Sequence, residues 1–270
     1  MMSARLQAMA PDNAPNPIQR CAPTGAAAFN IRGSTIHTFL SIPVGGKFAL
    51  LQGQPLTTLQ NKLDGVMYII VDEKSMVSLK LLYQIDSRLR QACPRRKDQP
   101  FGGFSLLLFG DFFQLTPVGQ KPLFHTKLKS EDEVNGQQSY YSIDQTTTLQ
   151  TIVRQAGTKQ AAFRDCLQAL RLGQGHVEIQ HWELLASRIV SVLSDDKVRK
   201  FQHATRLYFT RKDVERINNY SLRDISHAVL AIHALHDSPA SADTDEKDVQ
   251  NLQAILKVSV GSRVMLIANL

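Results

Sequence analysis

Two short runs of apolar residues each end abruptly at carboxylates. The first, at positions 66–71, leads into Asp72 and Glu73, and the second, at 104–109, is followed within two residues by Asp111. A continuous run of β-branched and aliphatic side chains predicts a strand of a parallel sheet that is covered on both faces. Open α/β sheets bind their ligands at the carboxyl ends of such strands. The pattern therefore predicts an α/β fold with a phosphate and metal site where these two strands end.

The segment between the two runs has a helical pattern. Leu79, Leu82, Ile85 and Leu89 recur at a spacing of three or four residues, whereas the opposite face is basic and polar. Such a stripe is typical of a surface helix that buries one face. We interpret these four side chains as core residues rather than as part of a cofactor site.

A turn and two short helices are predicted before the first run. Residues 23–25 form the turn, and a helix from Ala26 is closed by Gly33. Ser34 or Thr35 is expected to cap a second helix, because a side-chain oxygen at that position satisfies free amides of the first turn. The turn leaves backbone amides open to a phosphate, although a plain link between a strand and a helix is the commoner meaning of such a segment.

The later part of the chain repeats the arrangement of a strand that ends in polar residues. Residues 207–209 are a short apolar run that predicts a strand, and residues 211–222 predict a helix directly after it. The other elements expected here are a helix within 149–172 that stops at Gly173, an amphipathic segment at 182–193 and a β-hairpin around Gly261 within 256–270. This repetition predicts a second α/β unit.

These elements divide the chain into three predicted parts. Residues 1–17 are rich in Pro, Ala and Asn, which predicts a poorly ordered leader. Residues 18–155 form the first domain, and residues 156–270 begin a second one. Residues 237–248 are acidic and contain Ser and Ala, which is typical of an inserted surface segment. For the polar residues 119–148 no helix or strand is predicted.

The chain is basic, because 31 Lys and Arg residues against 24 Asp and Glu residues give a formal charge of +7. This excess favours a polyanionic partner, although a basic surplus is most often a solvated surface. No apolar run approaches the length of a membrane span, so no membrane partner is expected. The first residues also lack an apolar core of signal-peptide length.

The three cysteines, Cys21, Cys93 and Cys166, lie far apart and show no C-x-x-C spacing. This spacing argues against a disulfide framework and against a zinc site. We therefore expect a reducing, intracellular compartment, with the nucleus as the first expectation and the mitochondrion as the alternative.

The pair Asp72 and Glu73 has the composition of a site that hydrolyses a nucleotide. An aspartate at a strand end can hold Mg²⁺, which prefers oxygen ligands, and an adjacent glutamate can orient or deprotonate the attacking water. Gln114, after the second run, is a neutral group able to sense a γ-phosphate or to position that water. The alternatives are a solvated turn for the two carboxylates and a buried glutamine bonded to backbone for Gln114.

Other polar residues leave two interpretations open. Arg154 could place its guanidinium on a transferring phosphate or could form an ion pair at a helix end. Thr210, Arg211, Asn218 and Asn219 could contact a nucleic-acid backbone or could lie on a solvated helix surface. The sequence contains no G-x-x-x-x-G-K-[ST] loop, whose lysine and hydroxyl supply much of the charge stabilisation in phosphoryl transfer.

Six segments share an order along the chain that matches a known family. They read APTGAAAFNIRGSTIHTFL, IIVDEKSM, GDFFQLTPV, VRQ, LYFTRKDVERINN and VGSRVMLIANL. Together they resemble the petite-integration-frequency (PIF-type) ATP-dependent DNA helicases, including those encoded by Helitron transposons. The resemblance covers nearly everything from Cys21 to Leu270. It implies two RecA-like domains of the P-loop NTPase fold, with ATP hydrolysis between them driving 5′-to-3′ movement of a monomer on single-stranded DNA.

The resemblance also implies roles for individual residues. Asp72 and Glu73 correspond to the Walker B pair, with Asp72 for Mg²⁺ and Glu73 for the water. Gln114 corresponds to the glutamine that senses the γ-phosphate of ATP, and Arg154 to a phosphate-contacting arginine. The residues assigned to single-stranded DNA are Pro23, Thr24, Gly25, Thr35 and His37 in the first domain, with Thr210 and Asn218 in the second. Such contacts are mainly to backbone and therefore depend on salt.

The sequence departs from the family pattern in three places. The phosphate loop is expected upstream of Cys21, where an Ala- and Pro-rich leader stands, and further motifs are expected after Leu270. Thr116 stands where proline is usual. We therefore expect a truncated core of a helicase for DNA repair, recombination or telomere maintenance, with weak or no activity. The alternatives are a non-catalytic nucleic-acid-binding remnant and a transposon-derived fragment without a stable fold.

Overall fold

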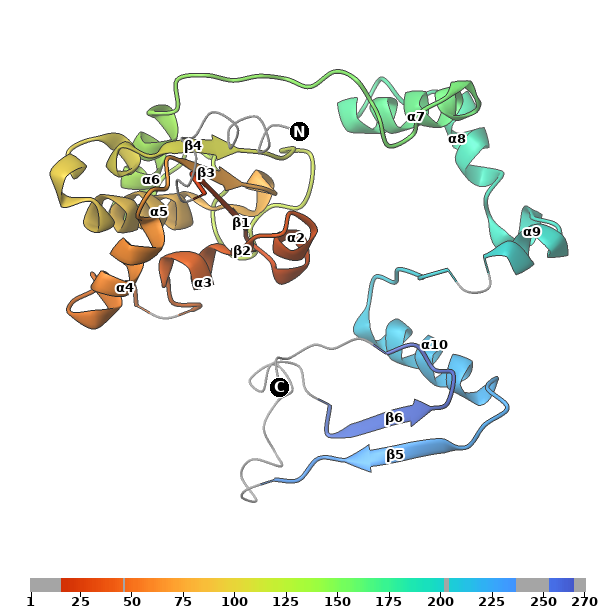
Figure 1. Cartoon of the computed structure of the whole chain (residues 1–270). Coiled ribbons are helices and arrows are strands. Elements are labelled where there is room, and N and C mark those ends of the chain that lie inside the picture. The colour runs from red at the N-terminus through yellow and green to blue at the C-terminus, as the bar shows by residue number, and fades with distance from the viewer. Residues whose placement is uncertain (1–15, 46, 202–203, 237–252, 265–270) are drawn as a thin grey trace. The chain divides into compact units, whose positions relative to one another are not determined.

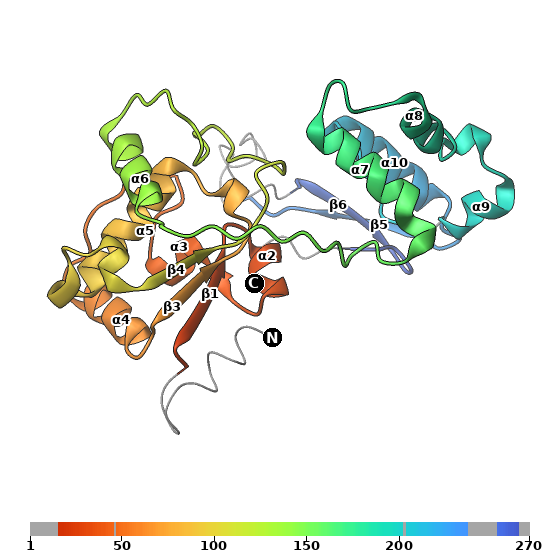
Figure 2. The same cartoon turned by 90° about the horizontal axis from the view of Figure 1, so that it is seen from above.

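The computed structural model describes residues 16–45, 47–201, 204–236 and 253–264. The chain divides into two compact units between Glu178 and Ile179, and each unit is described by itself (Figures 1 and 2). The boundary expected at 155/156 stays a prediction. The predicted leader lies almost wholly, and the acidic segment 237–248 entirely, outside the described residues.

The first unit is built on a parallel sheet of four strands. In spatial order these are β2 (Ser34–Thr35), β1 (Ile18–Ala22), β3 (Tyr68–Val71) and β4 (Ser105–Leu108). Cys21 pairs with Ser34 on one side and with Val71 on the other, and Val71 pairs with Leu108. The two strands expected from the apolar runs are confirmed as β3 and β4. Because all four strands run the same way, their carboxyl ends meet at one edge.

Two short helices follow the ends of β1 and β2, as the sequence predicts. In α2 (Gly25–Asn30) the N-cap is Thr24, and in α3 (Ile36–Leu40) the N-cap is Thr35. Both threonine side chains accept a hydrogen bond from a backbone amide of the first turn, from Ala27 and Thr38 respectively. Capping thus fixes the point at which each strand turns into a helix.

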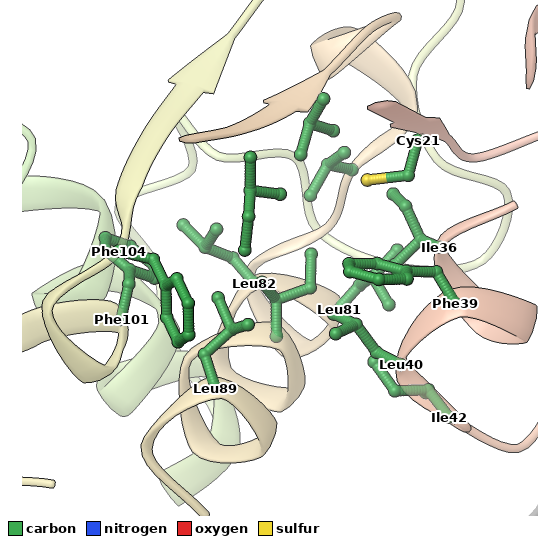
Figure 3. Packing of buried hydrophobic residues seen from close by; sticks show 14 of the residues in the cluster. Cys21, Ile36, Phe39, Leu40, Ile42, Leu81, Leu82, Leu89, Phe101 and Phe104 are labelled. Carbon is green, nitrogen blue, oxygen red and sulfur yellow. The ribbon is translucent and has the colours of Figure 1, made fainter. Parts of the chain in front are cut away.

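The core of the first unit lies between the sheet and α5 (Leu79–Ala92). Leu79, Leu82, Ile85 and Leu89 have no measurable exposure, so the predicted helix and its buried face are confirmed. Figure 3 shows side chains of α5 converging with those of α3 and of the turn before β4. The helices α3, α4 (Gln54–Leu63) and α5 lie on one side of the sheet (Figure 1).

A buried arginine joins α5 to the end of α3. Arg88 donates from Nε to the Leu40 carbonyl at 3.1 Å and from Nη2 to the Ser41 carbonyl at 3.2 Å. Its guanidinium carbon also lies 4.5 Å from the centroid of the Phe48 ring. Carbonyls at a helix C-terminus carry partial negative charge, so a cation is favoured there. This contact holds α3 in place from its C-terminal end.

One helix of the first unit was not predicted. Residues 131–141 form α6 (Glu131–Tyr141), which packs on α5 so closely that a Cβ on Gly136 would lie 1.9 Å from the Leu79 carbonyl oxygen. Its polar sequence hides the helical period. The signal that could have found it is Ser130 followed by Glu133, because Ser130 accepts the Glu133 amide as an N-cap.

Short 3₁₀ helices complete the connections of the first unit. They are η1 (Lys74–Met76), η2 (Pro94–Arg96), η3 (Pro100–Gly103) and η4 (Thr158–Gln160). The helix expected within 149–172 is confirmed as α7 (Ala161–Leu172), with Gly173 as its C-cap at φ 81°. Pro94 stands just after the end of α5, as a residue that cannot continue a helix.

The second unit differs from the sequence expectation in its strands. Its helical elements are α8 (Ile179–Ala186), η5 (Val190–Val192), α9 (Asp195–Lys200) and α10 (Arg211–Arg223), and α10 confirms the helix expected at 211–222. The strand predicted at 207–209 is wrong, because these residues are exposed and form no strand pairing within the described residues. An apolar run forms a strand only where a partner strand is available.

The hairpin predicted within 256–270 lies only partly in the described residues, so its pairing across Gly261 stays a prediction. Strand β6 (Ile255–Ser259) pairs antiparallel with β5 (Val229–His233), a strand that the sequence did not predict. Residues 265–270 lie outside the described part of the chain. Of the helices in the described residues, none is long and apolar enough to cross a membrane.

Candidate functional site

Asp72 and Glu73 lie at the carboxyl edge of the sheet, directly after β3. The Asp72 amide donates to the Cys21 carbonyl at 3.0 Å, which places Asp72 level with the end of β1. The Glu73 amide in turn donates to Asp72 Oδ1 at 3.0 Å. Both side chains are half-buried. The turn that carries these carboxylates is therefore anchored to the neighbouring strand.

Glu73 has a strained backbone. Its φ of 55° and ψ of 49° lie in the left-handed region, which costs a residue other than glycine about 1 kcal/mol or more. The conformation is held from both sides, because the Lys74 amide donates to the Phe109 carbonyl at 2.8 Å and the Met76 amide to the Glu73 carbonyl at 3.0 Å. Strain of this kind collects at functional sites, where surrounding contacts maintain it.

Gly110 lets the loop after β4 lie against the loop after β3. Its φ is 138°, and a Cβ there would stand 2.7 Å from the Lys74 amide nitrogen and 3.3 Å from the Glu73 carbonyl carbon. Any larger residue would push the two loops apart. The glycine therefore sets how closely Asp111 and the carboxylates of the first loop approach each other.

Asp111 was noted in the sequence as a carboxylate at a strand end but was given no role. Its Oδ1 accepts the Phe113 amide at 3.1 Å, and its Oδ2 forms an ion pair with Arg171 of α7. The hydrogen bond from Arg171 holds the pKa of Asp111 below its usual value, against an opposing effect of burial, with help from the Phe113 amide and the positive charges of Arg171 and Lys74. Asp111 is thus a stable anion at the edge of the sheet.

Gln114 and Arg154 have exposed side chains. The Gln114 amide donates to the Asp111 carbonyl at 3.0 Å, but its side chain is exposed, which rules out the buried glutamine that was its alternative. Arg154 is exposed as well, and in the described residues neither side chain bonds to Asp72 or Glu73. Their assignment as phosphate-contacting groups stays a prediction.

The residues expected to bind nucleic acid in the first unit follow β1 and β2. Pro23 and Thr24 are half-buried and Gly25 is exposed, and Thr35 lies one strand away because Ala22 pairs with it. Within the described part of the chain the Thr24 hydroxyl accepts a hydrogen bond and donates none, so its own hydrogen is available to a ligand. In contrast, the Thr35 hydroxyl donates to Thr38 Oγ1 at 2.8 Å.

His37 is the remaining member of this group. Burial lowers the pKa of the His37 imidazole below its usual 6.5, so the ring is neutral at pH 7. A neutral imidazole offers one donor and one acceptor and adds no charge. The first-unit residues that the sequence assigns to DNA binding therefore offer hydroxyl, amide and imidazole groups rather than a patch of positively charged side chains.

Comparisons with known proteins bear on the family and the fold. A family model described as PIF1-like helicase matches residues 11–181. The chain is 34% identical over 256 residues to the ATP-dependent DNA helicase PIF1 of Saccharomyces cerevisiae, covering 92% of this chain and 28% of that protein. The human ATP-dependent DNA helicase PIF1 is 31% identical over 255 residues, which are 92% of this chain and 36% of that protein.

The chain belongs to the PIF1-like helicase family. The recognition made from its motifs is thereby confirmed. The crystal structure of the Pif1 helicase from Candida albicans covers 99% of this chain with a TM-score of 0.59 and 26% sequence identity, and this chain covers 58% of it. The Bacteroides Pif1 structure in complex with ADP-AlF3 and ssDNA matches 92% of the chain at a TM-score of 0.55, 23% identity and 55% coverage of that chain, which bears on the fold alone. The α/β fold of the RecA-like type is confirmed.

This PIF1-like chain spans about a third of the length of its curated relatives, between 28% and 36% for the yeast and human proteins. The activity, substrates and partners of those whole proteins are therefore matters for proposal here. The names of the relatives describe them as ATP-dependent, and this describes those proteins.

The donor groups at this edge of the sheet suit a hard cation. Mg²⁺ is usually held by one or two carboxylates together with substrate phosphates and water, and Asp72 offers one such carboxylate. In the described residues no group of three or more His, Cys, Asp or Glu side chains could enclose a metal by itself. The buried Ser75 hydroxyl, two residues after Glu73, has no hydrogen-bond partner among the residues that the structure describes. Burial raises the pKa of the Cys21 thiol to about 12, so that group stays neutral beside the site.

The predicted residues of the second unit lie on α10. Thr210 is its N-cap, which accepts the Asp213 amide at 3.1 Å and donates to Asp213 Oδ2 at 2.6 Å. Asn218 is exposed, and Asn219 accepts a hydrogen bond from Lys257 of β6 at 3.1 Å. These contacts fix the helix start and join the helix to β6, whereas Arg211 and Asn218, the other two candidates of this group, are exposed.

Proposed function

We propose that this chain supplies nucleotide- and DNA-contacting parts of an ATP-dependent DNA helicase. The observation that carries the proposal is the shared edge of the sheet. Asp72 follows β3, Thr24 follows β1, and one backbone hydrogen bond of 3.0 Å, from the Asp72 amide to the Cys21 carbonyl, joins the two strand ends. A shift of the turn that carries Asp72 is therefore expected to displace the turn that carries Thr24.

The roles proposed at this edge follow from the chemistry of the groups. Asp72 would hold Mg²⁺ through a carboxylate oxygen, and Glu73 would orient or deprotonate the attacking water. ATP and Mg²⁺ are the proposed ligands, with Mg²⁺ supplying charge neutralisation on the phosphates. Gln114 and Arg154 are proposed to meet the γ-phosphate.

Single-stranded DNA is the proposed nucleic-acid partner. Support comes from the family and from the formal charge of +7. The free hydroxyl hydrogen of Thr24 and the exposed amide of Gly25 suit phosphate oxygens, which makes the contacts dependent on salt. Movement in the 5′-to-3′ direction, action as a monomer and a place in DNA repair, recombination or telomere maintenance belong to the same proposal.

A non-catalytic nucleic-acid-binding role is the second candidate for the isolated 270 residues. The observation that favours it is that these residues contain no G-x-x-x-x-G-K-[ST] loop. Without the lysine and hydroxyl of that loop, charge on the β- and γ-phosphates is poorly stabilised. We therefore propose that this chain alone binds DNA but turns over ATP weakly or not at all.

Phosphate release from ATP with saturating single-stranded DNA separates the two candidates. The 270-residue chain is compared with Glu73→Gln, which keeps the shape of the side chain and removes its base. We expect turnover at or near background, and any excess over background to vanish in Glu73→Gln. Turnover that persists in Glu73→Gln would refute the proposed role of Glu73.

DNA binding is tested separately by fluorescence anisotropy of a labelled single-stranded oligonucleotide. Thr24→Ala is expected to weaken binding, whereas Thr58→Ala, whose hydroxyl donates to the Gln54 carbonyl within α4, serves as the matched control. The affinity should fall linearly on a logarithmic scale as salt rises. Equal affinities for all three proteins would contradict a role for Thr24.

A further inference from the structure

Two arginines on α7 hold two different loops of the first unit. Arg164 and Arg171 are seven residues apart, which is close to two turns of a helix, so they lie on the same face of α7. Each contacts a segment far from it in sequence or just outside the helix. The segments they contact are those that carry Gln114 and Arg154.

Arg171 holds the loop that carries Gln114 at two points. Its Nη1 pairs with Asp111 Oδ2, and its guanidinium carbon lies 4.4 Å from the centroid of the Phe113 ring. A planar guanidinium can bond a carboxylate at its edge and stack on a ring with its face. Phe113 immediately precedes Gln114 and Asp111 lies three residues before it, so the position of that loop follows the position of α7.

Arg164 holds the segment after Arg154. Its Nη1 donates to the Gln155 carbonyl at 2.5 Å and to the Gly157 carbonyl at 2.7 Å. These two bonds fold the chain between Arg154 and Gly157 back against the first turns of α7. The backbone beside Arg154 is thereby tied to the same helix as the Gln114 loop.

These contacts are too exposed to serve mainly for stability. The side chains of Arg171 and Asp111 are 40% and 27% exposed. Exposed ion pairs of this kind contribute little to the free energy of unfolding. Their effect is instead on position, because an error of about 1 Å in the placement of a phosphate-contacting group can cost roughly a hundredfold in rate.

We propose that α7 is a bracket that sets the distance between the Gln114 loop and the Arg154 segment, with Arg164 and Arg171 as its positioning residues. The consequence for ATP rests on the proposed function, because it assumes that Gln114 and Arg154 meet one phosphate group. The bracket itself is a property of the folded chain and requires no nucleotide.

A distance measurement between two spin labels tests the bracket. Leu115→Cys and Val153→Cys place the labels beside Gln114 and Arg154, at positions that are 79% and 76% exposed. Cys93→Ser removes the native cysteine that is half-buried, while Cys21 and Cys166 are buried. The distribution of label distances is then recorded by pulsed electron spin resonance on the full 270-residue chain.

We expect a narrow distribution that widens in Arg171→Ala and in Arg164→Ala. Arg171→Lys keeps the charge opposite Asp111 and should restore much of the narrow distribution. Arg199→Ala removes a comparable exposed ion pair, with Asp196 on α9, and should leave the distribution unchanged. Thermal unfolding of the same variants should differ little, which separates a change of position from a loss of fold.

Two results would overturn the bracket. One is a broad distribution in the protein that keeps both arginines, and the other is a narrow distribution that neither alanine variant widens. Neither result depends on ATP or DNA. A chain that shows the expected distances but binds no single-stranded DNA would therefore refute the proposed function and leave the bracket standing.

Discussion

The sheet of the first unit and the strands of the second show opposite relations between sequence pattern and burial. In the first unit, Ile69 and Val71 of the sheet strand β3 and Leu82 of the helix α5 are fully buried. In the second, Leu230 of β5 is 62% exposed and Leu207 is 93% exposed. An apolar pattern predicts secondary structure well only where the side chains are buried. The reason is that the pattern reflects the free energy gained when apolar side chains are removed from water.

The largest expected effect comes from truncating the buried helix face. Leu82→Ala should lower the free energy of unfolding by about 2–5 kcal/mol, since it removes buried methylenes and leaves a cavity. Leu207→Ala, in the second unit, should change it by less than about 0.5 kcal/mol. Urea unfolding of both variants measures the difference. Equal losses would contradict the contrast between the two units.

A buried charge gives the next effect. Arg88→Met keeps the length and apolar stem of the side chain but leaves the Leu40 and Ser41 carbonyls without their donor, which should cost about 1–3 kcal/mol. Arg199→Ala, at an exposed pair, should cost at most about 1 kcal/mol. Urea midpoints compare the two. A smaller loss in Arg88→Met than in Arg199→Ala would show that Arg88 does not hold α3.

Adding a single methyl group at Gly136 tests how closely α6 packs on α5. Gly136→Ala would ordinarily stabilise a helix by about 1 kcal/mol, but here the added Cβ meets the Leu79 carbonyl. Overpacking should instead destabilise the protein by about 1–3 kcal/mol. Gln138→Ala, on an exposed position of α6, is the control, and a stabilised Gly136→Ala protein would disprove the close packing.

The smallest effect is the dependence of stability on pH at His37. Burial lowers the folded-state pKa of His37 below the unfolded value of 6.5, so its neutral form is favoured by folding. The stability it contributes is complete above pH 6.5 and is lost as the pH falls through that value toward the lowered folded pKa. His37→Asn should flatten this part of the curve of unfolding free energy against pH. A titration of His37 by NMR with a midpoint above 6.5 would contradict the assigned direction.

Local signals account for what the sequence predicted of the fold. Each of three features can be recognised from a single short segment: the apolar run before Asp72, the apolar run before Asp111 and the leucine stripe of α5. Thr35 at the start of α3 follows from capping, which is also local. The helix α6 was missed because its period is weak, although Ser130 and Glu133 carried a capping signal.

Contacts between distant residues account for what the sequence did not predict. β5 and β6 are separated by more than twenty residues, so their pairing could not be read from either strand alone. The Arg171 to Asp111 pair spans 60 residues and the left-handed Glu73 depends on Phe109. Sequence identified the carboxylates of the candidate site, whereas the loops that hold them required the three-dimensional arrangement.

Hydrogen exchange of the 270-residue chain with and without single-stranded DNA tests the central claim most directly. The shared edge predicts added protection both in residues 23–27, after β1, and in residues 72–74, after β3, because one backbone hydrogen bond joins the two turns. The α4 helix, Gln54–Leu63, should exchange at the same rate in both samples. Protection confined to residues 23–27, or absent from both turns while DNA is bound, would contradict the account.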